Sequence, residues 1–171
     1  LQGWSNAEHI RVWYQDFLGI RPRLLSESIA ITPRIPSAIG SLRYSERLGD
    51  GALEGAFERE KDCRRYVYRS VGITAELVLN IENYSELTLQ VAPKTTVELM
   101  ACGDRLDVTV TDASGKKIHE TTVGTDPVKV ARQQASDEYF EGVGFAVPSM
   151  RENLPSLSRY FEIPLDYSSV E

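Results

Sequence analysis

Hydrophobic residues near the beginning of the chain recur with the period of an α-helix. They follow the i, i+3, i+4, i+7 spacing that places side chains on one face, so we expect a helix over residues 5–18. The apolar positions cover an arc of roughly 140° and comprise Ala7, Ile10, Trp13, Tyr14, Phe17 and Leu18. Val12 lies alone among the polar positions of the opposite side.

Local signals mark both ends of this helix. Ser5 and Glu8 have the spacing of a capping box, in which each side chain bonds an amide of the first turn. Gly19 predicts the end, because glycine readily adopts the left-handed conformation that terminates helices. Pro22 follows and prevents the helix from continuing.

After Gly19 the hydrophobic period changes to that of β-strands. A charged hairpin tip is expected at Lys61 and Asp62, and a tight turn at DASG, where Gly115 takes positive φ. Short strands at regular spacing favour a mainly β chain, an antiparallel β-sandwich preceded by one amphipathic helix. The strand-like runs are SIAITPRI, GSLRYSERL, ALEGAFERE, CRRYVY, ITAELVLNI, ELTLQVA, TTVELMACG, RLDVTVT and KKIHETTV.

The pattern of the last third is compatible with more than one structure. TDPVKVARQQASDE suits a short helix with Asp126 as cap and Pro127 in the first turn, or a strand carrying Val128 and Val130. FEGVGFAV, residues 140–147, is expected to be a strand, and LSRYFEI, residues 157–163, the closing strand.

Composition narrows the classes of partner. Hydrophobic residues make up 42% and charged residues 26% of the 171 residues, and the net charge is −6. This is typical of globular proteins and favours neither nucleic acid nor an anionic membrane as partner. No apolar segment approaches the roughly 18 residues of a membrane span.

The cysteines and histidines carry no metal-binding pattern. Cys63 and Cys102 are far apart in sequence, and two buried thiols are favoured over one disulfide. His9 and His119 are accompanied by no CxxC or HxxxH spacing, so we expect no metal site and no cofactor. The sequence does not indicate a cellular compartment.

No catalytic constellation is recognisable in the sequence. It has no GxSxG elbow, no phosphate-binding GxxxxGK[ST] loop and no HExxH, and we predict no catalytic residue in this chain. Tyr66 and Tyr68 share one strand face and are expected to pack across strands rather than to bind sugar. A carbohydrate-binding module remains an alternative, although residues 20–171 contain no Trp to stack on a sugar.

Two segments, GWSNAEHIRVWYQDFLGIRP and SIAITPRIP, resemble the junction at the end of an (α/α)6-barrel glycoside hydrolase. They are most similar to the glycogen-debranching, amylo-α-1,6-glucosidase-like group. The resemblance covers about 36 residues. It rests on Trp4, Ser5, Ala7, Glu8, the turn Leu18-Gly19-Ile20, and Ile29, Ile31, Pro33 and Pro36.

The resemblance implies a division of the chain and a role. Residues 1–19 would be the last helix of a truncated catalytic barrel, and residues 20–171 a C-terminal β-sandwich domain. The catalytic carboxylates of such enzymes lie upstream, and Trp4 matches a residue that lines the sugar pocket. The chain would be a non-catalytic accessory domain that braces the barrel of an enzyme acting on α-glucan-type oligosaccharides.

The expected partner is therefore the catalytic barrel of the same parent chain. We expect Leu1 to be an internal edge of that parent. The alternatives are a carbohydrate-binding module and a structural domain that forms a homodimer through the apolar face of the helix.

Overall fold

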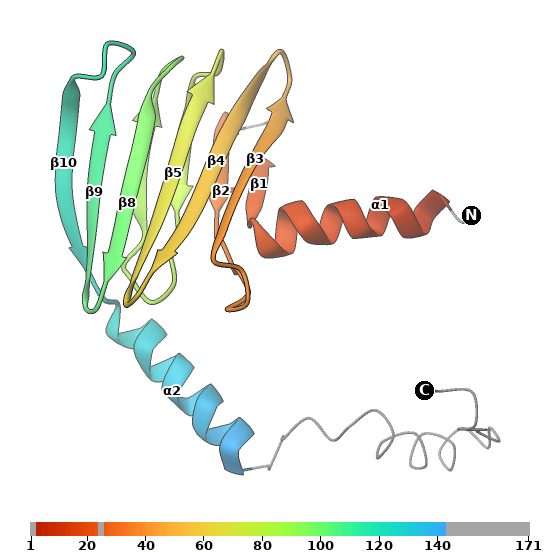
Figure 1. The fold of residues 1–171 in the computed structure, drawn as a ribbon, viewed down its shortest axis with the longest axis vertical. Coiled ribbons are helices and arrows are strands. Elements are labelled where there is room, and N and C mark those ends of the chain that lie inside the picture. The colour runs from red at the N-terminus through yellow and green to blue at the C-terminus, as the bar shows by residue number, and fades with distance from the viewer. Residues whose placement is uncertain (1–2, 24–25, 143–171) are drawn as a thin grey trace. The chain divides into compact units, whose positions relative to one another are not determined.

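The computed structural model of the chain describes residues 3–23 and 26–142, with side chains described between residues 7 and 135. It forms two compact units, Leu1–Val130 and Ala131–Glu171. The first unit contains the N-terminal helix and all ten described strands (Figure 1). In chain order the elements are α1 (Gly3–Arg11), the π-helix η1 (Val12–Phe17), β1 (Ile20–Arg23), β2 (Ser28–Ile31), β3 (Ser41–Leu48), β4 (Gly51–Glu60), β5 (Cys63–Val71), β6 (Ala75–Leu79), β7 (Leu87–Val91), β8 (Thr96–Cys102), β9 (Arg105–Thr111), β10 (Lys117–Gly124) and α2 (Pro127–Gly142).

The strands form the two layers of a β-sandwich, which confirms the predicted fold class. One sheet has the order β1-β2-β6-β7 and the other the order β10-β9-β8-β5-β4-β3. All neighbours are antiparallel except β2 and β6, which run parallel. The parallel pair brings together strands that are distant in sequence, so short-range turn signals could not reveal it.

Alternation along the strands places one row of side chains in the core and the other outside. In β8 and β9 the buried positions follow strict period 2, because successive side chains point to opposite faces of a sheet. The largest fully buried side chains are Tyr68, Tyr84, Phe57, Leu18, Ile20, Ile31, Leu53, Leu77, Leu79, Ile81, Leu99 and Leu106.

Both predicted turns are confirmed. Lys61 and Asp62 join β4 to β5, and Lys61 has a positive φ of 48°. Gly115 has a φ of 81° in the turn before β10. In that turn the Asp112 carboxylate accepts hydrogen bonds from the Ser114 amide at 2.8 Å and the Lys116 amide at 3.0 Å.

Three sequence predictions are wrong. Ser5 lies inside α1, whereas a capping residue has non-helical dihedral angles, and the Glu8 carboxylate pairs with Arg11 at 2.7 Å. Cys63 and Cys102 form a disulfide instead of two buried thiols. Phe140 and the next two residues belong to α2 rather than to a strand, whereas residues 143–147 and 157–163 lie outside the described part.

The helical alternative for the segment after Asp126 is confirmed. The Asp126 carboxylate accepts a hydrogen bond from the Val128 amide at 2.8 Å, and Pro127 begins α2. The Lys129 ammonium donates to the carbonyl of Tyr84 at 2.6 Å, and it also bonds the Asn80 side chain. These contacts attach the first turn of the helix to the loop between β6 and β7.

Candidate docking surface

The C-terminal end of the N-terminal helix is fixed to the sandwich. Leu18 and Ile20 are buried in the core on either side of Gly19, which has a φ of 69°. The Thr32 amide donates to the Gly19 carbonyl at 3.0 Å, and the Arg34 amide donates to the Phe17 carbonyl at 2.8 Å. A Cβ atom at Gly19 would lie 1.9 Å from the Thr32 carbonyl oxygen, so only glycine permits this approach.

Burial decreases along the helix away from this anchor. Leu18 is 0% exposed, Trp13 37% and Ile10 61%, and every described residue of α1 from Ala7 to Arg11 is exposed. Figure 1 shows α1 leaving the sandwich beside β1 and β3. Half of the predicted apolar arc is thus uncovered within the described chain. We call Ile10, Trp13 and Phe17 the helix face.

The end of the helix face nearest the sandwich is supported by it. Tyr14 packs against the core, and the rings of Trp13 and Phe17 meet edge to face with centroids 5.7 Å apart. Edge-to-face contacts of this kind favour a defined ring orientation. Phe17 therefore covers one edge of the Trp13 ring, and the rest of the ring stays exposed.

A π-helix links α1 to the anchor. The Leu18 amide donates to the Trp13 carbonyl at 3.0 Å, which is the i→i+5 bond of a π-helix. The wider turn changes the phase between residues 12–17 and α1. Val12, which α-helical periodicity assigns to the polar side, is accordingly half-buried.

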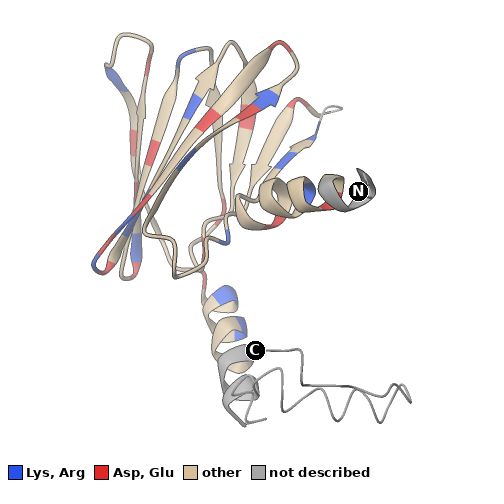
Figure 2. Cartoon of the chain, turned by 45° about the vertical axis from the view of Figure 1, so that its right-hand side comes forward, with Lys and Arg blue, Asp and Glu red and all other residues tan. Residues whose placement is uncertain are grey.

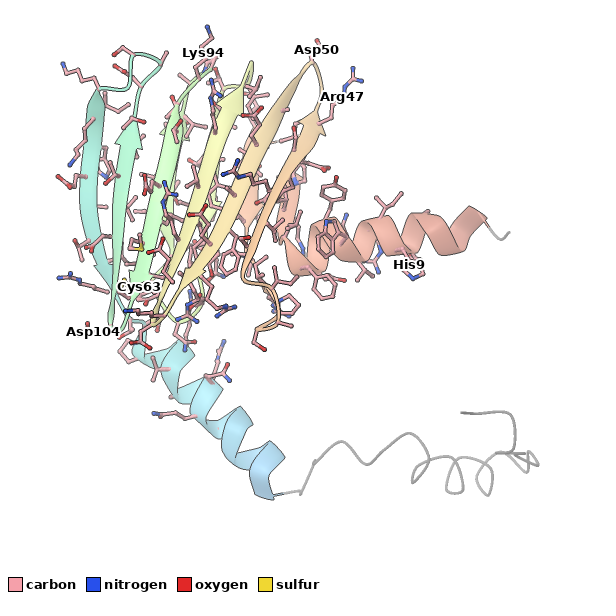
Figure 3. The ribbon with its side chains drawn as sticks, viewed as in Figure 1. His9, Arg47, Asp50, Cys63, Lys94 and Asp104 are labelled. Carbon is pink, nitrogen blue, oxygen red and sulfur yellow. A yellow bond between two sulfur atoms is a disulfide. The ribbon has the colours of Figure 1, made fainter. Side chains whose placement is uncertain are left out.

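The predicted sugar contact of Trp4 stays a prediction. Trp4 lies in the first turns of α1, and its side chain is outside the described part of the structure. His9 is exposed on α1, where Figure 3 labels it, and His119 is exposed on β10. Among the described residues no group of three or more His, Cys, Asp or Glu could hold a metal ion.

Tyr66 and Tyr68 pack in the core, as predicted from their shared strand face. They are 4% and 2% exposed, and the Tyr66 hydroxyl donates to a Glu82 carboxylate oxygen at 2.7 Å. Burial and the nearby carboxylate of Glu82 raise the pKa of Tyr66, and burial likewise raises the pKa of Tyr68. Neither ring offers a free face for stacking on a sugar.

The outer face of the six-stranded sheet is polar and largely ion-paired. Arg65 bonds the carboxylates of Glu98 at 2.7 Å and Glu58 at 3.1 Å, and Arg69 lies 3.6 Å from Glu54. Acidic and basic residues therefore alternate across neighbouring strands of this sheet (Figure 2). Sequence reasoning missed these pairs, although the charged residues occupy the outward alternate positions of their strands.

A shallow recess of about 460 Å³ lies on this outer face. Small and aliphatic residues line it together with three charged side chains. It is lined by Arg43, Tyr44, Ser45, Glu54, Gly55, Ala56, Val67, Arg69 and Thr96. Tyr44 is the single aromatic residue among them; its ring and hydroxyl lie against Gly55, its partner on β4, and burial raises its pKa.

Two observations complete the description of the site. None of the described helices is both long enough and apolar enough to span a membrane. Comparison with protein-family models, with curated proteins and with solved structures finds no match to this chain.

Proposed function

We propose that this chain is a non-catalytic accessory β-sandwich of a glycoside hydrolase that acts on α-glucan-type oligosaccharides. In this proposal the helix face docks on the (α/α)6 catalytic barrel of the same parent chain and braces it. The observation that carries the proposal is the exposure of Ile10 and Trp13 on a helix whose other end is buried. The similarity of residues 3–36 to the barrel–sandwich junction of debranching-type enzymes supports the choice of partner.

Physical considerations favour a helical partner for the helix face. An amphipathic helix obtains most of its stability from packing its apolar side, and α1 packs on no strand of the sandwich with its described side chains. Fully burying a large exposed apolar side chain stabilises a complex by about 1.5–3 kcal/mol, and Trp13, which is 37% exposed, would contribute a part of that. The helices of a barrel provide the ridges and grooves into which such a face fits.

Two carboxylates on the outer face of the six-stranded sheet, those of Glu58 and Glu98, are engaged in ion pairs. Glycosidases place two carboxyl groups on opposite sides of the scissile bond, and one of them must be protonated. Glu58 and Glu98 instead share the guanidinium of Arg65 as ion-pair partners. This arrangement supports a bracing role for the domain.

The experiment is a titration of this chain into the separately produced catalytic barrel of the parent, with binding measured by calorimetry. The double change Ile10→Ala and Trp13→Ala is expected to weaken binding at least about tenfold, because central apolar side chains dominate such interfaces. Ile118→Ala is the matched control, since Ile118 is 56% exposed on β10, away from the helix. Unchanged affinity of the double variant, or an equal loss in the control, would contradict the proposal.

Two further outcomes separate this proposal from its alternatives. Release of glucose from α-1,6-branched oligosaccharides by the chain alone would contradict a non-catalytic role. Light scattering that shows a dimer of the wild-type chain, lost in Trp13→Ala, would assign the helix face to self-association instead.

A further inference from the structure

Two arginines stand directly opposite each other at one end of the six-stranded sheet. Arg59 of β4 is the register partner of Arg64 of β5. Both occupy the inward row of alternate positions, which continues with Phe57 in β4 and Tyr66 in β5. Like charges directly opposite each other on one face of a sheet destabilise it unless an anion lies between them.

The described chain supplies one carboxylate for these two positive charges. Glu82, in the loop between β6 and β7, accepts from Arg64 at 2.8 Å through one carboxylate oxygen. Its other oxygen accepts from the Tyr66 hydroxyl at 2.7 Å. Both oxygens of Glu82 are thus engaged, one by Arg64 and the other by Tyr66.

Arg59 is the group left without an acceptor. Its Nε is buried and has no hydrogen-bond partner, and its side chain forms no ion pair with any residue that the structure describes. The guanidinium carbon lies 5.4 Å from the centre of the Phe57 ring, and the Arg59 amide donates to the Gly40 carbonyl at 2.8 Å. The group is therefore held in place and partly desolvated, and a buried donor in this state requires an acceptor.

The surroundings suit an oxyanion. Arg59, Arg64 and Glu82 together leave one positive charge, and the Arg64 side chain is 35% exposed, so the cluster meets solvent at Arg64. The site lies at the end of the sheet where Figure 3 labels Cys63 and Asp104, away from Asp50 and Lys94. The planar guanidinium group presents paired donors that match carboxylate and phosphate oxygens.

We propose that Arg59 and Arg64 form an oxyanion-binding site that takes a carboxylate or a phosphate group at the unpaired edge of the Arg59 guanidinium. The site is independent of the helix face, because it is built from β4, β5 and the loop between β6 and β7.

The test titrates the whole chain with sodium phosphate or sodium acetate at constant ionic strength and follows the NMR signal of the Arg59 side-chain Nε–H group. Saturable movement of that signal with either anion is the expected result, together with an anion-dependent rise in the midpoint of thermal unfolding. The stronger of the two anions distinguishes a phosphate site from a carboxylate site. Absence of saturable movement with both anions would overturn the proposal.

Variants make the same test specific. Arg59→Gln is expected to remove the anion-dependent rise and, in chloride buffer, to leave the unfolding midpoint unchanged or higher, because one of two opposed charges is gone. Arg59→Lys keeps the positive charge but lacks the paired donors of the planar guanidinium group. This variant should bind the anion at least about tenfold more weakly. Arg43→Gln, on the outer face, should respond like the wild type; an equal response in Arg59→Gln would overturn the proposal.

Discussion

At the scale of single residues, Gly19 sets the direction in which the helix face leaves the sandwich. Its positive φ ends the helix, and its missing side chain allows the backbone of Thr32 to approach. The two requirements are independent, since the first concerns the dihedral angle and the second concerns space. Gly49 has a similar φ of 61°, but a Cβ atom added there would meet nothing within 4 Å, so it isolates the first requirement.

We expect Gly19→Ala to lower the free energy of unfolding by about 3 kcal/mol or more, because the new methyl group overlaps the Thr32 carbonyl. Gly49→Ala should cost only about 1–2 kcal/mol, the penalty of the left-handed conformation. Urea unfolding followed by circular dichroism measures both variants. Equal losses in the two variants would show that the close approach at Thr32 is unimportant.

Some residues of this region can be predicted from sequence and others cannot. Gly19 is predictable as the end of the helix, because a helical period stops there and glycine favours the required φ. Ser5 is not, because a capping spacing can occur inside a helix by chance and the helix begins at Gly3. The exposure of Ile10 cannot be predicted from sequence. An apolar arc predicts that one face of the helix is buried, but it does not identify the segment or partner that covers this face.

At the scale of elements, strand alternation is the most informative signal. The runs from residue 40 to residue 111 are recognisable as strands because one face of each is more buried than the other. The ion pairs on the outer face and the pairing of β5 with β8 depend on which strands become neighbours. The order of strands in a sheet is fixed by tertiary packing. The alternation of apolar and polar residues along one strand does not encode it.

The disulfide illustrates this limit. Cys63 and Cys102 are separated by 39 residues and become direct partners only when β5 pairs with β8. Their Cα atoms are 4.5 Å apart, within the range that a disulfide can bridge. The register of two strands, rather than a spacing in the sequence, therefore brings them together.

We expect loss of this disulfide to lower the free energy of unfolding by about 4 kcal/mol, the loop-entropy value for a closed loop of this length. Urea unfolding of the wild-type chain with and without reductant measures the effect. The double variant Cys63→Ala and Cys102→Ala is the control and should be insensitive to reductant. A wild-type midpoint that reductant leaves unchanged would contradict a stabilising bridge.

At the scale of the first compact unit, the buried core of the sandwich is distinct from the exposed N-terminal helix. The sandwich buries most of its inward-facing apolar side chains, and Arg65 on the outer face of the six-stranded sheet pairs with Glu58 and Glu98. The helix face carries two exposed large apolar side chains, Ile10 and Trp13, next to the buried Leu18, and clustered apolar surface can mark an interaction site. Our proposal therefore places the bracing contact on the helix rather than on the sheet surface.

The most direct measurement is hydrogen exchange of the backbone amides in the chain alone and in its complex with the catalytic barrel. Our proposal predicts that exchange in residues 7–17 slows at least about tenfold in the complex, because docking stabilises the exposed helix. The strands of the six-stranded sheet should exchange at unchanged rates. A complex that forms with unchanged exchange in residues 7–17, or with protection on the outer face of that sheet instead, would contradict the proposal.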